Sequence, residues 1–346
     1  MKVTSTEKNS DIQIIRALAI MLVVFQHTLS LTYEDNIVAG FVKMACYKID
    51  VTTFFFISGF LFQMKESGYQ NIGNAAFLMN KAKQLLVPYL FWNTLIHVLV
   101  WAAYYSGIDS IIVLVSKLGF KNFSMLQIAR NLLTYCDYHV EIYWFIYVLF
   151  LVFVMNKIFC RQMVFIKVAL VESFILFVLA LTNIDILNKI ALGGMMFLAG
   201  ECASRIGYNF TSIKCKYIPV VFSIFTVIFF IRLPNENHLI SCIELIRSVV
   251  LGLCGVELVA CLAIVLGRNN MLREHFEEIG NESFSIYLLH TPYIIGPLYY
   301  VTRIFLPNSF VCTICVSILG IVLPVLIDKL MSKTNLRIWI WCMGKA

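Results

Sequence analysis

Apolar runs of bilayer-spanning length recur along this whole chain, and they leave few folds open. A membrane-spanning helix needs about 20 predominantly apolar residues. The runs here are continuous, whereas strands of a membrane barrel alternate between apolar and polar residues. We therefore predict an all-α polytopic integral membrane protein with about ten transmembrane helices. The expected spans are 12–32, 42–64, 85–105, 140–158, 163–181, 186–205, 217–233, 240–266, 282–304 and 309–331.

The composition agrees with this class of protein. Hydrophobic residues make up 60% of the chain and charged residues 14%, and the mean hydropathy is +0.83. Soluble domains carry about 25% charged residues. We expect one membrane-embedded domain over residues 1–346, with a short tail at 332–346 and no appended soluble domain. The polar stretch 110–135 is expected to form either an interfacial amphipathic helix or a cap over an outward-facing cavity.

The distribution of basic residues predicts the orientation in the membrane. If the N-terminus lies inside and the spans alternate, most of the 27 lysines and arginines fall in inner loops and tails. This bias is the positive-inside rule, and it predicts cytoplasmic N- and C-termini in a multi-pass protein of the cell membrane. The net charge of +7 follows from the same bias. Because no compact basic tract with interleaved aromatic residues occurs, we expect no nucleic-acid partner.

Two ionisable residues stand out inside the first apolar run. Arg16 and His27 are eleven positions apart, so on a helix their side chains differ by only about 20° around the axis and roughly 16 Å along it. An ionisable residue in a membrane helix is costly and usually faces the protein interior or a wet cavity. His27 has the chemistry of a general base. The structural alternative is a polar side chain that joins two helices through a hydrogen bond.

A second group of residues lies around the inner end of the second span. Ser58 and Gly59 permit close approach of another helix. Lys81 and Lys83 precede a helix whose first turn contains Pro88, a position where proline is well tolerated. As point charges at the inner boundary, the two lysines either bind the phosphates of a cytoplasmic donor or serve as ordinary basic anchors.

Two further blocks combine polar and aromatic residues. Trp144 lies in the Tyr-Trp-Phe sequence at the outer start of the fourth span, where aromatic residues usually form an interfacial belt. In the ninth span, Ser283, Tyr287 and His290 share one side of the predicted helix. Such a polar stripe does not suit a lipid-facing surface. We expect Ser58, Trp144, Tyr287 and His290 to line a substrate cavity.

The sequence gives little support for a metal site, a redox site or further catalytic charges. Glu244 and Arg247 are one helical turn apart and are expected to neutralise each other. The pair Cys312 and Cys315 has CxxC spacing, but it lies in an apolar helix with no second cysteine pair and no nearby histidine. We therefore assign this pair neither a metal-binding nor a redox role. We therefore expect no metal site.

Five of these motifs occur in one order along the chain and together resemble the acyltransferase family 3 of membrane proteins. The resemblance covers essentially the whole chain. It rests on Arg16 and His27, the Phe-Phe-x-Ile-Ser-Gly-Phe run that ends at Phe60, Lys81 to Pro88-Tyr89, Trp144-Phe145, and Ser285-Ile-Tyr-Leu-Leu-His290-Thr-Pro292. Members of this family transfer acyl groups to surface carbohydrates and other envelope molecules.

The resemblance implies roles for individual residues. His27 corresponds to the catalytic histidine and Arg16 to its essential companion. Lys81 occupies the place where the family often has the first arginine of an Arg-x-x-Arg pair. Gln84 stands at the second arginine position, a departure that puts phosphate binding there in doubt, and Lys83 is the basic substitute nearby.

The expected activity is therefore transfer of an acyl group, by default acetyl from acetyl-CoA, to a hydroxyl group of an envelope carbohydrate or lipid-linked glycan. Lys81, Lys83 and Arg16 are the candidate donor-binding residues. His27 acts either as a general base or as a transient acyl carrier. Succinyl or longer acyl groups remain open.

A transporter that exports a glycan without making a bond would have a similar hydropathy profile. Many transporters carry internal repeats and paired broken helices at equivalent positions. The chain shows no detectable repeat of this kind, which favours the enzyme.

Overall fold

The computed structural model describes residues 5–33, 36–105, 143–159, 165–182, 184–210, 215–231, 238–334 and 336–345. The segment 110–135, predicted to be an interfacial helix or a cap, lies outside this set. The described residues form helices and no strand. Their order is α1 (Ser5–Thr32), α2 (Ile37–Met64), α3 (Glu66–Gln70), α4 (Asn74–Lys81), the π-helical turn η1 (Ala82–Leu86), α5 (Val87–Tyr105), α8 (Trp144–Phe159), α9 (Phe165–Ala180), α10 (Asp185–Arg205), the short 3₁₀ turn η4 (Cys215–Tyr217), α11 (Ile218–Phe230), α12 (His238–Gly267), α13 (Asn270–Asn281), α14 (Ser283–Leu289), the π-helical turn η5 (His290–Ile294), α15 (Ile295–Phe305), α16 (Ser309–Lys333) and α17 (Arg337–Cys342).

The all-α polytopic membrane architecture predicted from the sequence is confirmed. Within the described residues, six helical stretches are long and apolar enough to cross a membrane: Ser10–Thr32, Ile37–Met64, Asn74–Ala102, Asp185–Arg205, Ile240–Gly267 and Ser309–Lys333. Three shorter apolar helices accompany them at Trp144–Lys157, Val171–Ala180 and Ile218–Phe230. All nine stretches overlap runs predicted from the sequence.

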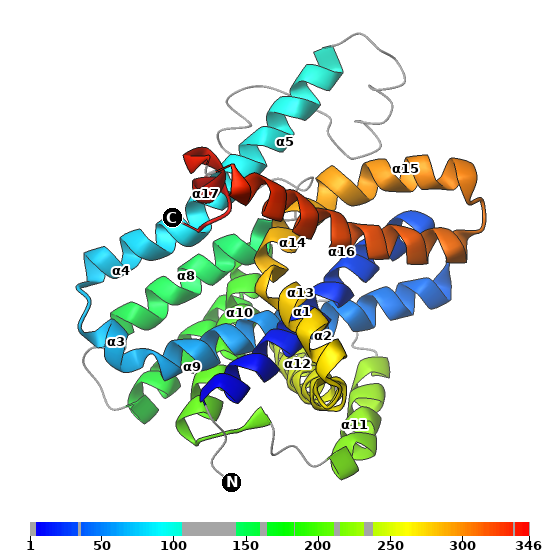
Figure 1. Cartoon of the computed structure of the whole chain (residues 1–346). Coiled ribbons are helices and arrows are strands. Elements are labelled where there is room, and N and C mark those ends of the chain that lie inside the picture. Colours follow the sequence, from blue (N-terminus) through cyan, green and yellow to red (C-terminus); the bar gives the residue numbers. More distant parts are fainter. Residues whose placement is uncertain are drawn as a thin grey trace.

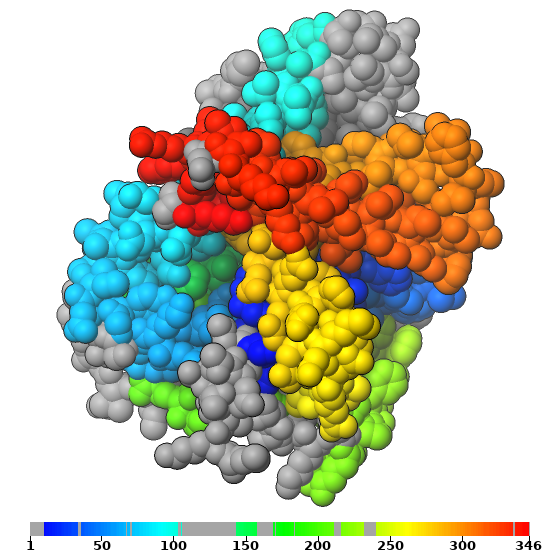
Figure 2. Space-filling model, viewed as in Figure 1, coloured from blue at the N-terminus to red at the C-terminus, as the bar shows by residue number. Residues whose placement is uncertain are grey.

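The first helix, α1, lies at the centre of the bundle. Ile14, Ile15, Ala19 and Ile20 are fully buried, and their side chains point in different directions around the helix axis. A helix that is apolar on every side is normally surrounded by protein. Here α1 contacts α2, α12, α13 and α16. In the space-filling view, neighbouring helices cover most of the blue first helix, with the yellow α13 segment lying across it (Figure 2). Side chains on α1 therefore face other helices along most of its length.

The backbones of α2 and α10 cross at close range. A Cβ atom added at Gly59 would overlap the backbone carbonyl of Phe197, and one added at Gly200 would overlap the carbonyl of Phe56. Small residues allow this backbone approach, which is a common way of packing membrane helices. The Ser-Gly motif of α2 thus provides the close helix contact that the sequence predicted, and it packs the C-terminal half of α2 against α10.

The third predicted span begins earlier than expected and is bent. The helix starts at Asn74 as α4, passes through η1 and continues as α5, so Pro88 lies within a continuous helical segment. Proline has no backbone N–H and cannot bond the carbonyl four residues earlier, which here belongs to Gln84. The wider π turn at 82–86 precedes this position. Lys81 therefore ends α4 and Lys83 lies inside the irregular turn, so neither lysine stands at a helix start.

The C-terminal tail packs between α5 and α16 (Figure 1). The indole N–H of Trp92 donates to the carbonyl of Cys342 over 2.9 Å. Gly344 has a φ of 64° and lies against the carbonyl of Gln84, so a side chain there would be both strained and obstructed. At the other side, Asp328 of α16 accepts hydrogen bonds from Trp339 and Lys345. The tail is thus bound to both helices.

The predicted pairing of Glu244 with Arg247 is confirmed, with 2.7 Å between carboxylate and guanidinium. Lys48 of α2 joins the same carboxylate at 2.9 Å. The guanidinium of Arg247 also donates to the carbonyls of Ile228 and Phe229 in α11. These charged groups join α2, α11 and α12. We assign them a structural role and no role in catalysis.

Candidate active site

A cavity of about 240 Å³ opens between α1 and α2 at the end where the two helices are connected. It is lined by Val23, Gln26, His27, Ser30, Lys43, Tyr47, Val51, Trp144 and Tyr287. The lining therefore combines one imidazole, one ammonium group and several hydroxyl or amide groups with aromatic walls.

Helical periodicity explains why these residues meet. The α1 residues lie at positions i, i+3, i+4 and i+7 from Val23, which is one face of a helix. The α2 residues are spaced by four from Lys43, which gives a second face. Because the connection between α1 and α2 is short, the late part of α1 faces the early part of α2. His27 and Lys43 consequently lie on opposite walls of one cavity.

A second histidine lies directly beside His27. The ring centroids of His27 and His290 are 5.3 Å apart and their planes are inclined by 57°. His290 is fully buried. Its Nδ1 atom lies 2.9 Å from the carbonyl oxygen of Ile286 and 2.8 Å from that of Tyr287, so Nδ1 carries the proton. In the neutral ring, Nε2 is then a hydrogen-bond acceptor, and it has no partner among the described residues.

A break in the ninth predicted span positions this histidine. The predicted span 282–304 does not form one continuous helix. Thr291 has an extended backbone, with φ −135° and ψ 141°, and it separates α14 from α15. The cause is Pro292, which excludes helical geometry from the residue before it and supplies no N–H. The carbonyl of Tyr287 loses its ordinary helical donor at position 291 and accepts the imidazole N–H of His290 instead.

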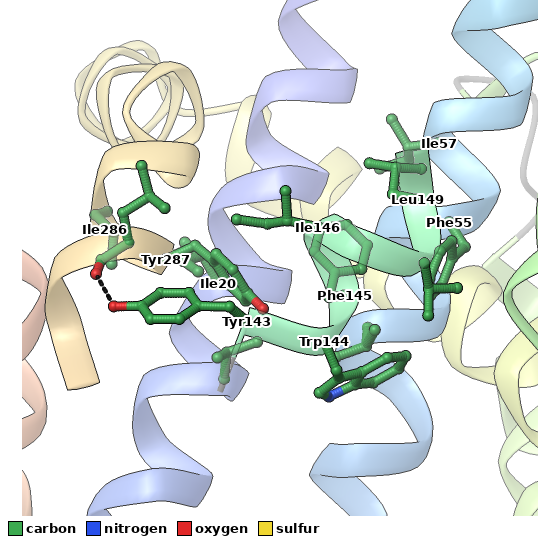
Figure 3. Packing of buried hydrophobic residues seen from close by; sticks show 14 of the residues in the cluster. Ile20, Phe55, Ile57, Tyr143, Trp144, Phe145, Ile146, Leu149, Ile286 and Tyr287 are labelled. Atoms are coloured by element: carbon green, nitrogen blue, oxygen red, sulfur yellow. Dashed lines mark hydrogen bonds between the residues drawn. The ribbon is translucent and has the colours of Figure 1, made fainter. Parts of the chain in front are cut away.

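Aromatic side chains from three helices form the wall behind the cavity. The Tyr143 hydroxyl donates to the carbonyl of Leu288 in α14 over 3.0 Å, and Figure 3 shows this bond next to Tyr287. Phe145 contacts Tyr287 edge to face at 5.5 Å and Phe55 of α2 at 4.9 Å. The Tyr-Trp-Phe block is buried among helices, so it does not form an interfacial belt. It fixes Trp144 and Tyr287 against the cavity.

The predicted donor-binding residues lie elsewhere. The ammonium group of Lys81 is 4.2 Å from the ring centroid of Phe153 and is also close to the rings of Tyr69 and Phe77. Cation–π attraction of this kind stabilises a partly desolvated charge. Burial also raises the pKa of the Tyr69 phenol, which keeps this wall of the lysine site neutral. Lys83 faces the ring of Trp341 in the tail at 5.6 Å.

Arg16 lies on α1, eleven positions before His27. It is half-buried, and its guanidinium donates to the side chain of Gln13 over 3.1 Å. The structure thus brings together four sequence-predicted residues, His27, His290, Trp144 and Tyr287. It leaves Arg16, Lys81, Lys83 and Ser58 outside the lining of that cavity.

Sequence reasoning missed several groups at the site. Lys43, Gln26, Ser30 and Tyr47 line the cavity but belong to none of the motifs identified from the sequence. The available signal was the helical spacing of Gln26 and Ser30 around His27. Asp50 was also missed. It is fully buried in α2, its Oδ1 accepts the N–H of Val51, and its Oδ2 has no partner in the described part of the chain. An acidic residue in a membrane helix is itself a functional signal.

Comparison with known proteins agrees with the motifs. No curated protein and no solved structure matches the chain. A family model described as an acyltransferase domain matches residues 9–329, which include α1, the aromatic wall, the histidine at the helix break and most of α16. This match covers nearly the whole chain, so the protein belongs to acyltransferase family 3 and is a membrane acyltransferase.

Proposed function

We propose that this protein transfers an acyl group, most simply acetyl from acetyl-CoA, to a hydroxyl group of a cell-envelope carbohydrate. The observation that carries the proposal is the position of His27 in a cavity beside His290. His290 holds its own proton on Nδ1 toward two backbone carbonyls, which leaves its Nε2 free to accept a hydrogen bond from His27. Such a bond would select the tautomer of His27 whose other nitrogen presents a lone pair.

The chemistry needs one base near the acceptor hydroxyl. In the direct route, His27 removes the hydroxyl proton while the oxygen attacks the thioester carbonyl carbon. The carbon–sulfur bond breaks, and the departing thiolate takes the proton from the imidazolium. In the covalent route, an imidazole nitrogen of His27 attacks the thioester carbonyl carbon, the carbon–sulfur bond breaks, and the departing thiolate takes the remaining N–H proton of the acylated ring. The acceptor hydroxyl then attacks the acyl carbon, the carbon–nitrogen bond breaks, and the hydroxyl proton passes to the freed imidazole. General acid–base catalysis of this kind contributes about 10²–10⁴-fold.

The donor is proposed to approach from the opposite, cytoplasmic end. Lys81 precedes η1 and Lys83 lies within it, where it faces Trp341 of the C-terminal tail. Neither lysine belongs to the lining of the cavity that contains His27. Their charges suit the phosphates of an acyl-CoA as point charges. Arg16 lies on the same helix as His27, roughly 16 Å before it at about 1.5 Å per residue, and it is the third basic group proposed to bind the donor. This arrangement supports a donor whose thioester reaches along α1.

Export of a glycan without bond formation is the second candidate function. One observation favours it, namely the break between α14 and α15 beside the cavity, because discontinuous helices form the binding sites of many transporters. In that case, His27, Trp144 and Tyr287 of the cavity lining would bind cargo and no bond would be made.

The decisive experiment measures acyl transfer by the purified full-length chain in proteoliposomes loaded with radiolabelled acetyl-CoA or succinyl-CoA. We expect His27→Ala to reduce transfer to the background rate. His97→Ala is the matched control, because His97 is also a buried membrane histidine but hydrogen-bonds the carbonyl of Asn93 in its own helix. Transfer at the wild-type rate by His27→Ala would disprove the catalytic assignment. Glycan movement without any acyl transfer would favour the exporter.

A further inference from the structure

Lys43 is the cationic group of the cavity, and its position on α2 is specific. It is one turn before Tyr47 and two turns before Val51, and all three line the cavity wall opposite His27. The side chain is exposed at the rim. The face of α2 that carries it therefore points to the cavity, so the ammonium group is available to a ligand that occupies the space next to His27.

Other lysines at this end of the molecule are neutralised by carboxylates. Lys48 lies 2.9 Å from Glu244 and also contacts Ser248, and Lys189 lies 2.6 Å from Asp185. Lys43 has no ion pair or hydrogen bond among the described residues. None of the nine residues that line the cavity is acidic. Within the described parts of the chain, the positive charge of Lys43 is therefore not neutralised by a carboxylate.

The remaining lining suits part of a carbohydrate. Gln26, Ser30 and Tyr47 supply polar groups, while Trp144 and Tyr287 supply aromatic surface. The volume of about 240 Å³ is slightly below the range of about 300–1,000 Å³ that is usual for small-molecule sites. A space of this size accepts about one sugar residue and leaves the rest of a glycan outside.

We propose that Lys43 binds an anionic group, a carboxylate or a phosphate, carried by the acceptor close to the hydroxyl that is acylated. This inference rests on the proposed function and specifies its acceptor as an acidic or phosphorylated glycan. Hydrogen bonds from an ammonium group to such anions are about twice as strong as neutral ones. The contact would place the sugar between Lys43 and His27 and so select the hydroxyl presented to the imidazole.

The test measures binding in the absence of any acyl donor, so that its outcome does not depend on transfer. The full-length protein is placed in phosphatidylcholine nanodiscs and titrated with three probes: a glucose trisaccharide, a glucuronic acid trisaccharide and a glucose trisaccharide that carries one phosphomonoester. We expect one or both acidic probes to bind at least tenfold more tightly than the neutral one. Lys43→Gln should remove this preference, and Lys43→Arg should retain it.

Arg303→Gln is the matched control. Arg303 is exposed at the end of α15, and the hydrogen bond between Thr313 and Thr32 places the adjoining start of α16 beside the end of α1. This variant removes one positive charge from the same end of the protein without touching the cavity lining, so it should leave the preference unchanged.

Any of three results would overturn the proposal. The first is equal binding of acidic and neutral probes, and the second is absence of binding by both acidic probes. The third is an acidic preference that survives Lys43→Gln. A further arm uses nanodiscs that contain phosphatidylglycerol. If this lipid displaces the acidic probe from the wild type, the ammonium group is a headgroup contact and the proposal is wrong. His27→Ala should keep the acidic preference, because it leaves Lys43 in place. Failure of acyl transfer in the separate proteoliposome assay would contradict the proposed function alone.

Discussion

The imidazole rings of His27 and His290 lie 5.3 Å apart, centroid to centroid, although they come from opposite ends of the chain. One belongs to the central helix α1 and lines a cavity, and the other is sealed behind it at a break between α14 and α15. The Nδ1 proton of His290 is committed to the carbonyls of Ile286 and Tyr287. The ring is therefore oriented by backbone, and this gives His27 a neighbour of defined orientation and tautomer.

Replacing His290 should impair transfer without removing substrate binding. We expect His290→Phe, which keeps a ring but loses both nitrogens, to lower kcat by about 10²-fold, at the low end of what acid–base groups contribute. The KM for the donor should change little, because Lys81 and Lys83 are untouched. His290→Gln keeps polar groups and should retain more activity than His290→Phe. Initial-rate kinetics in proteoliposomes separate kcat from KM, and an unchanged kcat in both variants would contradict this role.

Removing the charge at Lys81 should weaken the donor interaction. Its ammonium group sits against Phe153, Tyr69 and Phe77 and near the side chain of Gln84. We expect Lys81→Gln to raise the KM for acetyl-CoA about tenfold, since one charge-assisted phosphate contact corresponds to about 1.5 kcal/mol. Lys65→Gln serves as the control, because Lys65 is an exposed lysine at the end of α2. A similar KM in both variants would show that Lys81 is an anchor only.

The crossing of α2 and α10 should tolerate no added methyl group. Because a Cβ atom at Gly59 would overlap the Phe197 carbonyl, we expect Gly59→Ala to destabilise the fold by about 3 kcal/mol, the upper end for overpacking. Gly40→Ala, in the same helix but with open space around it, should have a stability close to that of the wild type. Thermal unfolding of the detergent-solubilised protein tests the difference. Equal melting temperatures for the two variants would show that the crossing is looser than the structure indicates.

The C-terminal tail should depend on Asp328. This buried carboxylate accepts hydrogen bonds from Ser285, Trp339 and Lys345, so Asp328→Ala leaves several donors without a partner. We expect a loss of stability of about 3 kcal/mol, as for the breaking of other buried pairs. Lys345→Met should cost less, because Lys345 is 42% exposed and solvent screens its charge.

The measurement is limited proteolysis of the tail together with thermal unfolding. Asp328→Ala should expose the 336–345 segment to cleavage. Lys329→Met is the control, since Lys329 pairs with Glu278 at an exposed position, and surface pairs contribute about 0–1 kcal/mol. Equal protection of the tail in Asp328→Ala and the wild type would rule out this anchoring role.

Much of the fold was determined by the sequence alone, because hydrophobicity is a local property. The apolar runs identified the membrane helices, and the eleven-residue spacing placed Arg16 and His27 on one helix. The one-turn spacing of Glu244 and Arg247 also predicted their ion pair correctly. Each of these inferences needs only the geometry of a single helix.

The tertiary structure decided which residues meet. The cavity is formed by Lys43 and Tyr47 approaching His27 across two helices, and no spacing within one helix predicts such a contact. The break at Thr291 could be suspected from Pro292, yet only the packing of α14 beside α1 turns it into a neighbour for His27. Likewise, the residue pattern of the C-terminal tail did not predict its contacts with Gln84 and Asp328. Long-range contacts of this kind depend on how helices pack in three dimensions, so they became visible only in the folded chain.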